Sequence, residues 1–298
     1  MSRISKAWRN TRFYRRRAAK WLPHALILGA QKAGTSALFA YLGQHPRLAP
    51  SREKEVSFFG SDLRYALGLE WYATQWHHRT PADALRFEAS PLYLFAKQAP
   101  GRILACVPKA KLIVMFRDPI ERAYSAWRMY RRQLADDPLF YHNLYRTRFT
   151  PEEVALFEER TASEFDDFWL AVQREAESLE RGRSRRCSVL ELGVYAPQLQ
   201  RYFDVFPREQ LLVLDSEDLR TRRVETLNRV LDFLGLPPWD WSQANLADVF
   251  VGNSSAPIPP RARDFLREFY REPNRRLAAM LDEPPQFARG DVWHLASA

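Results

Sequence analysis

The sequence predicts an α/β fold with three layers, in which helices flank a central parallel sheet. Short apolar runs of strand length alternate with segments whose apolar residues recur at helical spacing, as is typical of parallel sheets with crossover helices. The first run also leads into a compact loop with glycine and hydroxyl residues, which is the order of a P-loop-like fold. Strands are expected near 25–28, 85–88, 112–116 and 211–215, and the last of them is expected to be buried. Helices are expected near 67–76, 221–234 and 260–280, helical stretches around 152–180, and a turn-rich connection at 44–50.

Length and composition favour one globular domain. A chain of 298 residues with 46% hydrophobic residues can bury a full core. We expect residues 24–298 to form this domain and residues 1–23 to form a basic leader. Residues 1–20 hold eight Lys or Arg and no acidic residue, and removing these eight charges from the formal net charge of +9 leaves +1. A near-neutral body argues against nucleic-acid binding over the whole surface.

The basic leader has two interpretations. It lacks the apolar stretch of a secretory signal, and no run in the chain approaches the length of a membrane span. A solvated or surface-packed helix explains it. Alternatively, residues 1–20 attach the protein peripherally to an anionic membrane through interleaved basic and aromatic side chains. These are Arg15, Arg16, Arg17 and Lys20, with Trp8, Phe13 and Trp21.

The cysteine and histidine content indicates a reducing, cytoplasmic setting. The two cysteines, Cys106 and Cys187, allow neither a disulfide framework nor a CxxC metal motif. Of the six histidines only His77 and His78 are close in sequence, and adjacent side chains on a helix point apart. We therefore expect no metal site.

The segment 24–42, HALILGAQKAGTSALFAYL, predicts a strand, an anion-binding loop and a helix. Successive backbone N–H groups and a helix N-terminus directed at one point favour a phosphate or a similar anion. A nucleotide triphosphatase loop carries lysine directly after its second glycine, as GxxxxGK[ST]. Here Thr35 follows Gly34, and Lys32 lies inside the loop. The loop therefore departs from the ATP and GTP pattern.

KAGTSAL, residues 32–38, resembles the loop of PAPS-dependent sulfotransferases, which reads like KxGT[ST/R]AL. In that family the loop binds the 5'-phosphosulfate of 3'-phosphoadenosine 5'-phosphosulfate (PAPS). The resemblance covers most of residues 24–280 and is closest to the glycan-modifying, heparan sulfate type of sulfotransferase domain, as a bacterial-type cytoplasmic member. It implies that the donor is held by Lys32, Ala33, Gly34, Thr35 and Ser36.

SREKEVSFFG, which follows, places a carboxylate beside an apolar cluster at 56–59. Partial desolvation of Glu55 there would raise its pKa and make it a usable base. The resemblance sharpens this expectation, because an EVxFF or EIxFF segment in glycan-modifying sulfotransferases supplies the glutamate that takes the proton from the acceptor hydroxyl. Glu53 is the fallback candidate, and a solvated surface charge is the alternative for both.

The second expected strand runs into LRFEASPLYLF. Glu88, Ser90 and Tyr93 lie at its carboxyl end, where ligands collect in parallel sheets, so we expect them to bind substrate in the same crevice as Lys32. Related sulfotransferases often carry EKxxxYF here, with a lysine near the reacting centre. Ala89 stands at that position, which leaves Lys32 as the main cation. Glu88 can equally be a structural partner.

KLIVMFRDPIERAYSAWRMY carries the second strong signal. Its apolar run 112–116 predicts a strand buried on both faces, and Asp118 with the following proline predicts a helix start. Arg117 offers a planar fork of donors for phosphate, and Ser125 adds a neutral donor. RDPxERxxS resembles the family's site for the 3'-phosphate of PAPS. The alternative is an ion pair of Arg117 with Asp118 or Glu121.

Three later segments carry further expectations. Residues 131–187 form a helical and loop elaboration, which either contacts the acceptor or is a cap without a ligand. GVYAPQLQRYFDVFP resembles the family's GxYxxxLxxWxxxFP and places Tyr195 near the nucleotide, with a core tyrosine as the alternative. Asn253, Ser254 and Ser255 stand where the family has a loop that closes over the donor, and a plain turn explains them equally.

These expectations together predict a PAPS-dependent sulfotransferase that acts without metal. Glu55 removes a proton from an acceptor hydroxyl, on a glycan or glycolipid, and Lys32 stabilises charge on the leaving phosphate oxygen of the product 3',5'-ADP (PAP). Two other functions stay open. One is a P-loop ATP-dependent kinase or hydrolase, and the other is a non-catalytic relative that binds anionic glycan through its basic leader.

Overall fold

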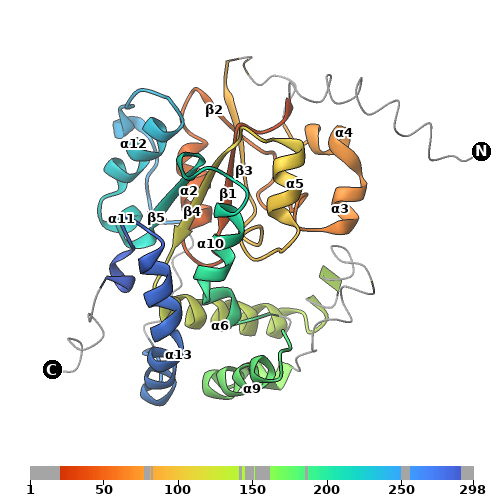
Figure 1. Ribbon diagram of the computed structural model, residues 1–298, viewed down its shortest axis with the longest axis vertical. Coiled ribbons are helices and arrows are strands. Elements are labelled where there is room, and N and C mark those ends of the chain that lie inside the picture. Colours follow the sequence, from red (N-terminus) through yellow and green to blue (C-terminus); the bar gives the residue numbers. More distant parts are fainter. Residues whose placement is uncertain are drawn as a thin grey trace, which may run out of the picture.

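The computed structural model describes residues 21–76, 81, 83–140, 143–144, 151, 162–184, 187–249 and 256–289. In this part of the chain five parallel strands form one sheet in the order β2-β3-β1-β4-β5, and helices pack around it (Figure 1). The strands are β1 Ala25–Gly29, β2 Leu48–Pro50, β3 Leu85–Ala89, β4 Lys111–Phe116 and β5 Leu211–Asp215. The expected α/β fold and the four expected strands are confirmed.

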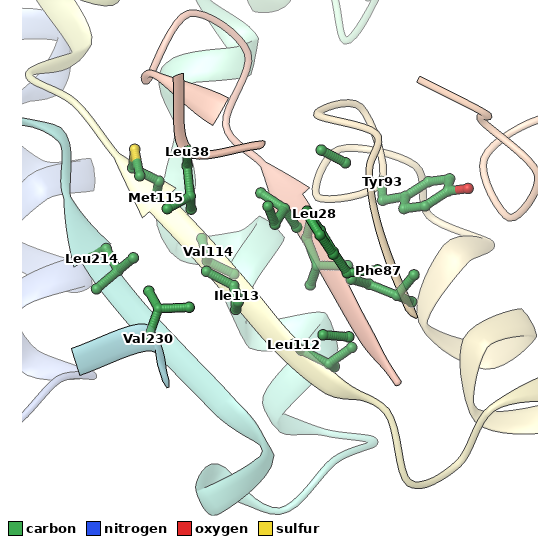
Figure 2. Packing of buried hydrophobic residues seen from close by; sticks show 14 of the residues in the cluster. Leu28, Leu38, Phe87, Tyr93, Leu112, Ile113, Val114, Met115, Leu214 and Val230 are labelled. Carbon is green, nitrogen blue, oxygen red and sulfur yellow. The ribbon is translucent and has the colours of Figure 1, made fainter. Parts of the chain in front are cut away.

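The central strands β1 and β4 are almost entirely apolar because they have neighbours on both sides and helices on both faces. All five residues of β1 are buried, and β4 is buried from Leu112 to Phe116. Figure 2 shows side chains of β1, β3, β4 and β5 packed side by side in this core. Leu26 lies opposite Glu88 of β3 on one side and Leu112 of β4 on the other. This parallel register brings the carboxyl ends of the strands to one edge of the sheet.

The two edges of the sheet differ from the expectations. Residues 44–47 form turns as expected, but residues 48–50 form the short strand β2, which pairs with β3 and ends at Pro50. A proline is tolerated there because β2 is an edge strand, and its three residues gave no periodic signal. We also expected the run near 211–215 to be buried, but β5 is the opposite edge strand and only Leu214 and Asp215 are buried.

The helices agree with the expected pattern. The expected helices near 67–76, 221–234 and 260–280 correspond to α4, α12 and α13. Asp118 caps α6 as expected, accepting hydrogen bonds from the Ile120 and Glu121 amides at 2.8 and 3.3 Å. The bounds are α2 Thr35–Leu42, α3 Asp62–Ala66, α4 Gly68–Ala73, α5 Ala99–Cys106, α6 Pro119–Asp136, α9 Phe168–Glu180, α10 Tyr195–Phe203, α11 Ser216–Thr221, α12 Arg223–Phe233 and α13 Pro260–Ala279.

A second hydrophobic cluster lies beside the sheet. It is built by α6, α9, α13 and buried residues of the segment 187–190, which form a group below the sheet in Figure 1. The helical stretches expected around 152–180 are confirmed where they are described, as a short 3-10 helix at Ala162–Phe165 and as α9. Residues 152–161 lie outside the described part. The domain boundaries expected at 23 and 24 stay predictions. Among the described helices none combines the length and hydropathy needed to cross a membrane.

Candidate active site

A cavity of about 1760 Å³ opens at the carboxyl edge of the sheet. The segments that follow β1, β3, β4 and β5 line it, together with residues 54–61 and the start of α13. It brings together nine of the expected site residues, namely Lys32, Ala33, Gly34, Thr35, Ser36, Glu55, Tyr93, Arg117 and Ser125. Glu88, Ser90 and Tyr195 do not line it, and Asn253, Ser254 and Ser255 lie outside the described residues.

The loop between β1 and α2 forms one wall of this cavity. The Ala30 amide donates to the Met115 carbonyl at 2.7 Å, and Gln31 Oε1 accepts from the Tyr130 hydroxyl at 2.8 Å. Gly34 has a φ of +92°, a conformation that favours glycine, and it is the N-cap of α2. Because glycine offers no capping side chain, an anion can accept hydrogen bonds from the first amides of α2 without a competitor.

Positive charge is concentrated around Lys32. Burial is the main cause that lowers its pKa, and the charges of Arg117, Arg132 and Lys54 lower it further, whereas Glu55 acts in the opposite direction. These like charges repel one another. A phosphate or sulfate group would relieve this repulsion, which favours an anionic ligand at the loop.

Arg117 and Ser125 approach the loop from β4 and α6. Arg117 Nη1 donates to the Lys32 carbonyl at 3.3 Å, and its Nη2 lies 4.0 Å from Glu121 Oε2. The ion pair with Glu121 that was considered as the alternative for Arg117 is therefore present. The Arg117 side chain is still 36% exposed and lines the cavity, as does Ser125, so both can also reach a ligand.

Arg263 is a cationic cavity residue that the sequence reasoning missed. It lies in the first turns of α13, lines the cavity and places its Nη2 3.4 Å from Glu121 Oε1. Glu121 thus links Arg117 and Arg263, which are 146 positions apart in the chain. The signal available in the sequence was its position soon after the segment 253–255, where the resemblance implies a loop that closes over the donor.

Tyr195 supports the site from behind. Its side chain is buried and its hydroxyl donates to the Arg117 carbonyl at 2.9 Å, while its ring centroid lies 4.5 Å from that of Phe116. Burial raises the pKa of this phenol. The alternative of a core tyrosine fits this geometry, and its link to the site is the backbone of Arg117.

Glu55 lies on the cavity wall and is partly exposed. Its side chain is 41% exposed, and Oε1 accepts from Lys54 Nζ at 2.7 Å. The expected apolar neighbours Val56, Phe58 and Phe59 are buried, whereas the Glu55 carboxylate keeps access to solvent and a cationic partner. The role of Glu55 as the base stays a prediction. Glu53 is exposed and does not line the cavity, which makes it the weaker base candidate.

Glu88 and Ser90 lie behind the cavity wall, so the structure does not place them to bind substrate. Glu88 is 0% exposed and accepts hydrogen bonds from Tyr72, Tyr93 and Ser90. Burial raises its pKa, and these three hydrogen bonds act against the rise. The Tyr93 ring reaches the cavity lining, but its hydroxyl is directed at Glu88. The structural alternative for Glu88 fits its position.

A further part of the lining had no signal in the sequence. The Arg223 guanidinium lies 5.2 Å from the Tyr41 ring centroid, and its Nη2 pairs with Asp248 at 2.5 Å. These residues meet only through the fold. Among the described residues, no group of three or more His, Cys, Asp or Glu side chains is placed to hold a metal ion.

Comparisons of the sequence with known proteins find sulfotransferases. The family model described as "Sulfotransferase domain" matches residues 22–247. Human bifunctional heparan sulfate N-deacetylase/N-sulfotransferase 3 is 31% identical over 287 residues, which are 87% of this chain and 30% of that protein. Human heparan sulfate glucosamine 3-O-sulfotransferase 3B1 is 33% identical over 224 residues, 75% of this chain and 49% of that protein.

A solved structure shows the same similarity. The crystal structure of a sulfotransferase from Alicyclobacillus acidocaldarius is 26% identical, with a TM-score of 0.63, and the match covers 87% of this chain and 95% of that one. The chain therefore spans less than half the length of the two human relatives and nearly all of this solved protein.

Proposed function

The chain belongs to the sulfotransferase domain family, and from this premise we propose that it transfers a sulfuryl group from PAPS to a hydroxyl group of a carbohydrate. The main observation in support of PAPS as the donor is the loop at 30–36. There the start of α2, which has no side-chain cap, lies beside the cationic cluster of Lys32, Arg117 and Lys54. Thr35 stands where an ATP- or GTP-binding loop has its lysine, which favours a donor without a terminal triphosphate.

The donor lies across the loop between two sets of phosphate ligands. Lys32 and the amides of Gly34, Thr35 and Ser36 hold the 5'-phosphosulfate, because the loop and the start of α2 direct N–H groups at one point. Arg117 and Ser125 hold the 3'-phosphate. Arg263 is a further cation on this side of the cavity. Tyr195 fixes the backbone of Arg117 and so the direction from which its guanidinium arrives.

The reaction is an in-line displacement at sulfur, for which PAPS supplies an activated sulfuryl group. Glu55 accepts the proton of the acceptor hydroxyl as that oxygen forms a bond to sulfur. The bond between sulfur and the bridging phosphate oxygen breaks, and its electron pair stays on that oxygen. Lys32 stabilises this growing negative charge, and 3',5'-ADP leaves.

The carbohydrate acceptor is supported by the relatives. Proteins named as heparan sulfate N-sulfotransferases and 3-O-sulfotransferases are both about 30% identical to this chain. A glutamate base is suited to removing a proton from a hydroxyl group. The cavity also has room for a carbohydrate, because it extends beyond the loop, past Arg128 and Gln133 of α6. The cytoplasmic setting stays a prediction, and so does membrane contact through residues 1–20, which lie outside the described part.

Calorimetric titration with 3',5'-ADP, and separately with ATP and magnesium, tests the donor. Tight binding of 3',5'-ADP with little binding of ATP is expected, and the reverse would make the protein an enzyme of nucleoside triphosphates. Sulfate transfer from PAPS to desulfated heparan sulfate, assayed with N-acetylated and with free-amine forms, then tests the acceptor. A product sulfated only on nitrogen would contradict the hydroxyl acceptor, and no transfer at all would favour the non-catalytic alternative.

A further inference from the structure

We propose that Glu88 is a positioning residue for Glu55, acting through Ser90 and Tyr93 on the backbone of residues 55–59. The inference rests on the proposed function, in which Glu55 is the base. It gives a role to a buried carboxylate that does not reach the cavity and that the reaction itself does not use.

The carboxylate of Glu88 organises three hydroxyl groups. Its Oε1 accepts from Tyr72 at 2.5 Å and from Tyr93 at 2.7 Å, and its Oε2 accepts from Ser90 Oγ at 2.8 Å. With its side chain 0% exposed, this acceptor-only group has its hydrogen bonds within the protein. A satisfied buried network of this kind is rigid, because breaking any member leaves a polar group without a partner.

Each hydroxyl has one proton, so directing that proton at Glu88 fixes the hydroxyl oxygen as an acceptor. Ser90 Oγ accepts from the Ser57 amide at 2.9 Å, and the Tyr93 hydroxyl accepts from the Phe59 amide at 3.3 Å. The Glu55 amide donates to the Ala89 carbonyl at 2.8 Å. Three alternate amides of the segment 55–59 are therefore tied to the residues around Glu88.

The segment needs such support because its backbone is unusual. Glu55 has a φ of +66° and Ser57 a φ of +55°, a region that side-chain-bearing residues adopt only when their surroundings enforce it. The aromatic rings add packing, since the Phe58 and Tyr72 ring centroids are 4.4 Å apart. Glu55 itself is 41% exposed, so it is the backbone ties, and not burial of the carboxylate, that keep it on the cavity wall near Lys32.

Removal of single links tests this role. Ser90→Ala removes the acceptor of the Ser57 amide, and Tyr93→Phe removes that of the Phe59 amide. Each should lower kcat by about 10- to 100-fold, because small misplacement of a catalytic group costs this much, while the Kd for 3',5'-ADP stays unchanged. Tyr270→Phe is the matched control, since it also removes a buried phenol hydroxyl, bonded to the Leu190 carbonyl at 2.8 Å in the second cluster. It should keep kcat.

Variants of Glu88 separate positioning from chemistry. In Glu88→Gln the remaining carbonyl oxygen can accept from both tyrosines, and the amide can donate to Ser90 Oγ, which still accepts from Ser57. Glu88→Gln should therefore keep most of the turnover, whereas Glu88→Ala should lose it. If Glu88→Gln were as inactive as Glu88→Ala while Ser90→Ala and Tyr93→Phe behaved as wild type, Glu88 would act in the chemistry and the positioning role would be refuted.

Hydrogen exchange gives a readout that does not depend on activity. The Ser57 amide should exchange faster in Ser90→Ala than in wild type, and at the wild-type rate in Tyr270→Phe. The wild-type protein separates the two proposals. If it fails to bind 3',5'-ADP and to use PAPS, the proposed function fails and takes this inference with it. If it is active and Ser90→Ala matches its kcat and its Ser57 exchange, only the inference fails.

Discussion

Replacing Lys32 by methionine should lower turnover and raise the stability of the ligand-free protein. Methionine keeps the unbranched stem at a backbone φ of +67°, so the change removes the charge without a new backbone requirement. Burial and the charges of Arg117, Arg132 and Lys54 lower the pKa of Lys32, which means that the folded protein holds this cation unfavourably. We therefore expect the charge to act on a bound ligand.

The two effects have separate magnitudes. Loss of one preorganised group at the leaving oxygen should reduce kcat by about 10²- to 10³-fold, or about 2.7–4 kcal/mol. Relief of the repulsion should add on the order of 0.5–2 kcal/mol of stability, as optimised charges commonly do. In a domain of this size about 1 kcal/mol corresponds to a rise in Tm of about 2–4 °C.

The pH dependence of stability has a definite sign. Because the folded-state pKa of Lys32 lies below its ordinary value of 10.5, the unfolded chain binds the proton more tightly. The cost is fully present at neutral pH and is relieved as the pH rises from the lowered pKa towards 10.5. Lys32→Met should lack this alkaline gain relative to wild type.

Thermal unfolding with and without 3',5'-ADP, together with a PAPS turnover assay, measures these effects. Lys32→Met should unfold at a higher temperature without ligand and show a smaller shift with it. Lys111→Met is the control, because Lys111 lies at the opposite end of the sheet, over the Phe233 ring at 4.7 Å, and should leave kcat unchanged. A lower Tm for Lys32→Met would refute the electrostatic reasoning, and a normal kcat would refute its role at the leaving oxygen.

Arg117→Ala should weaken the binding of 3',5'-ADP, measured by calorimetry, by about 10- to 100-fold and reduce the preference of the protein for 3',5'-ADP over 5'-AMP. The control Arg222→Ala, at an exposed arginine, should change neither quantity. Glu55→Gln should lower kcat by about 10²- to 10⁴-fold with 3',5'-ADP binding intact, and normal turnover would direct the search for the base to Glu53. Tyr195→Phe should lower the free energy of unfolding, measured with denaturant, by about 0.5–1.5 kcal/mol and should also weaken the binding of 3',5'-ADP. Unchanged binding would mean that the Tyr195 hydroxyl does not orient Arg117.

The strand-loop-helix at 24–42 and the strand-helix at 111–130 could be predicted because their determinants are contiguous in the chain. Apolar runs define β1 and β4, Gly34 permits the left-handed turn before α2, and Asp118 caps α6. Each of these is a requirement of local backbone geometry or of periodic burial. The strand β2 was not predicted, because three residues on an edge strand are too few to show a periodic pattern of burial.

The surroundings of individual charged side chains could not be predicted from the sequence. Glu55 and Glu88 both stand beside apolar residues in the chain, yet one is 41% exposed and paired with Lys54, and the other is 0% exposed under three hydroxyl groups. Burial depends on which distant segment covers a residue, and the neighbours in sequence do not specify that segment. Arg263 reaches Glu121 for the same reason, across 142 positions.

The sequence alone therefore determined the type of fold and predicted the loop at 30–36 with most of the expected residues that line the cavity, because short-range geometry and side-chain chemistry encode them. Only the tertiary structure decided that Glu55 lines the cavity and that Glu88 is buried behind its wall. It also decided that the cations of three separate segments meet around Lys32. Desolvation and charge repulsion depend on distances through space, and those distances are fixed only when the sheet and its helices pack together.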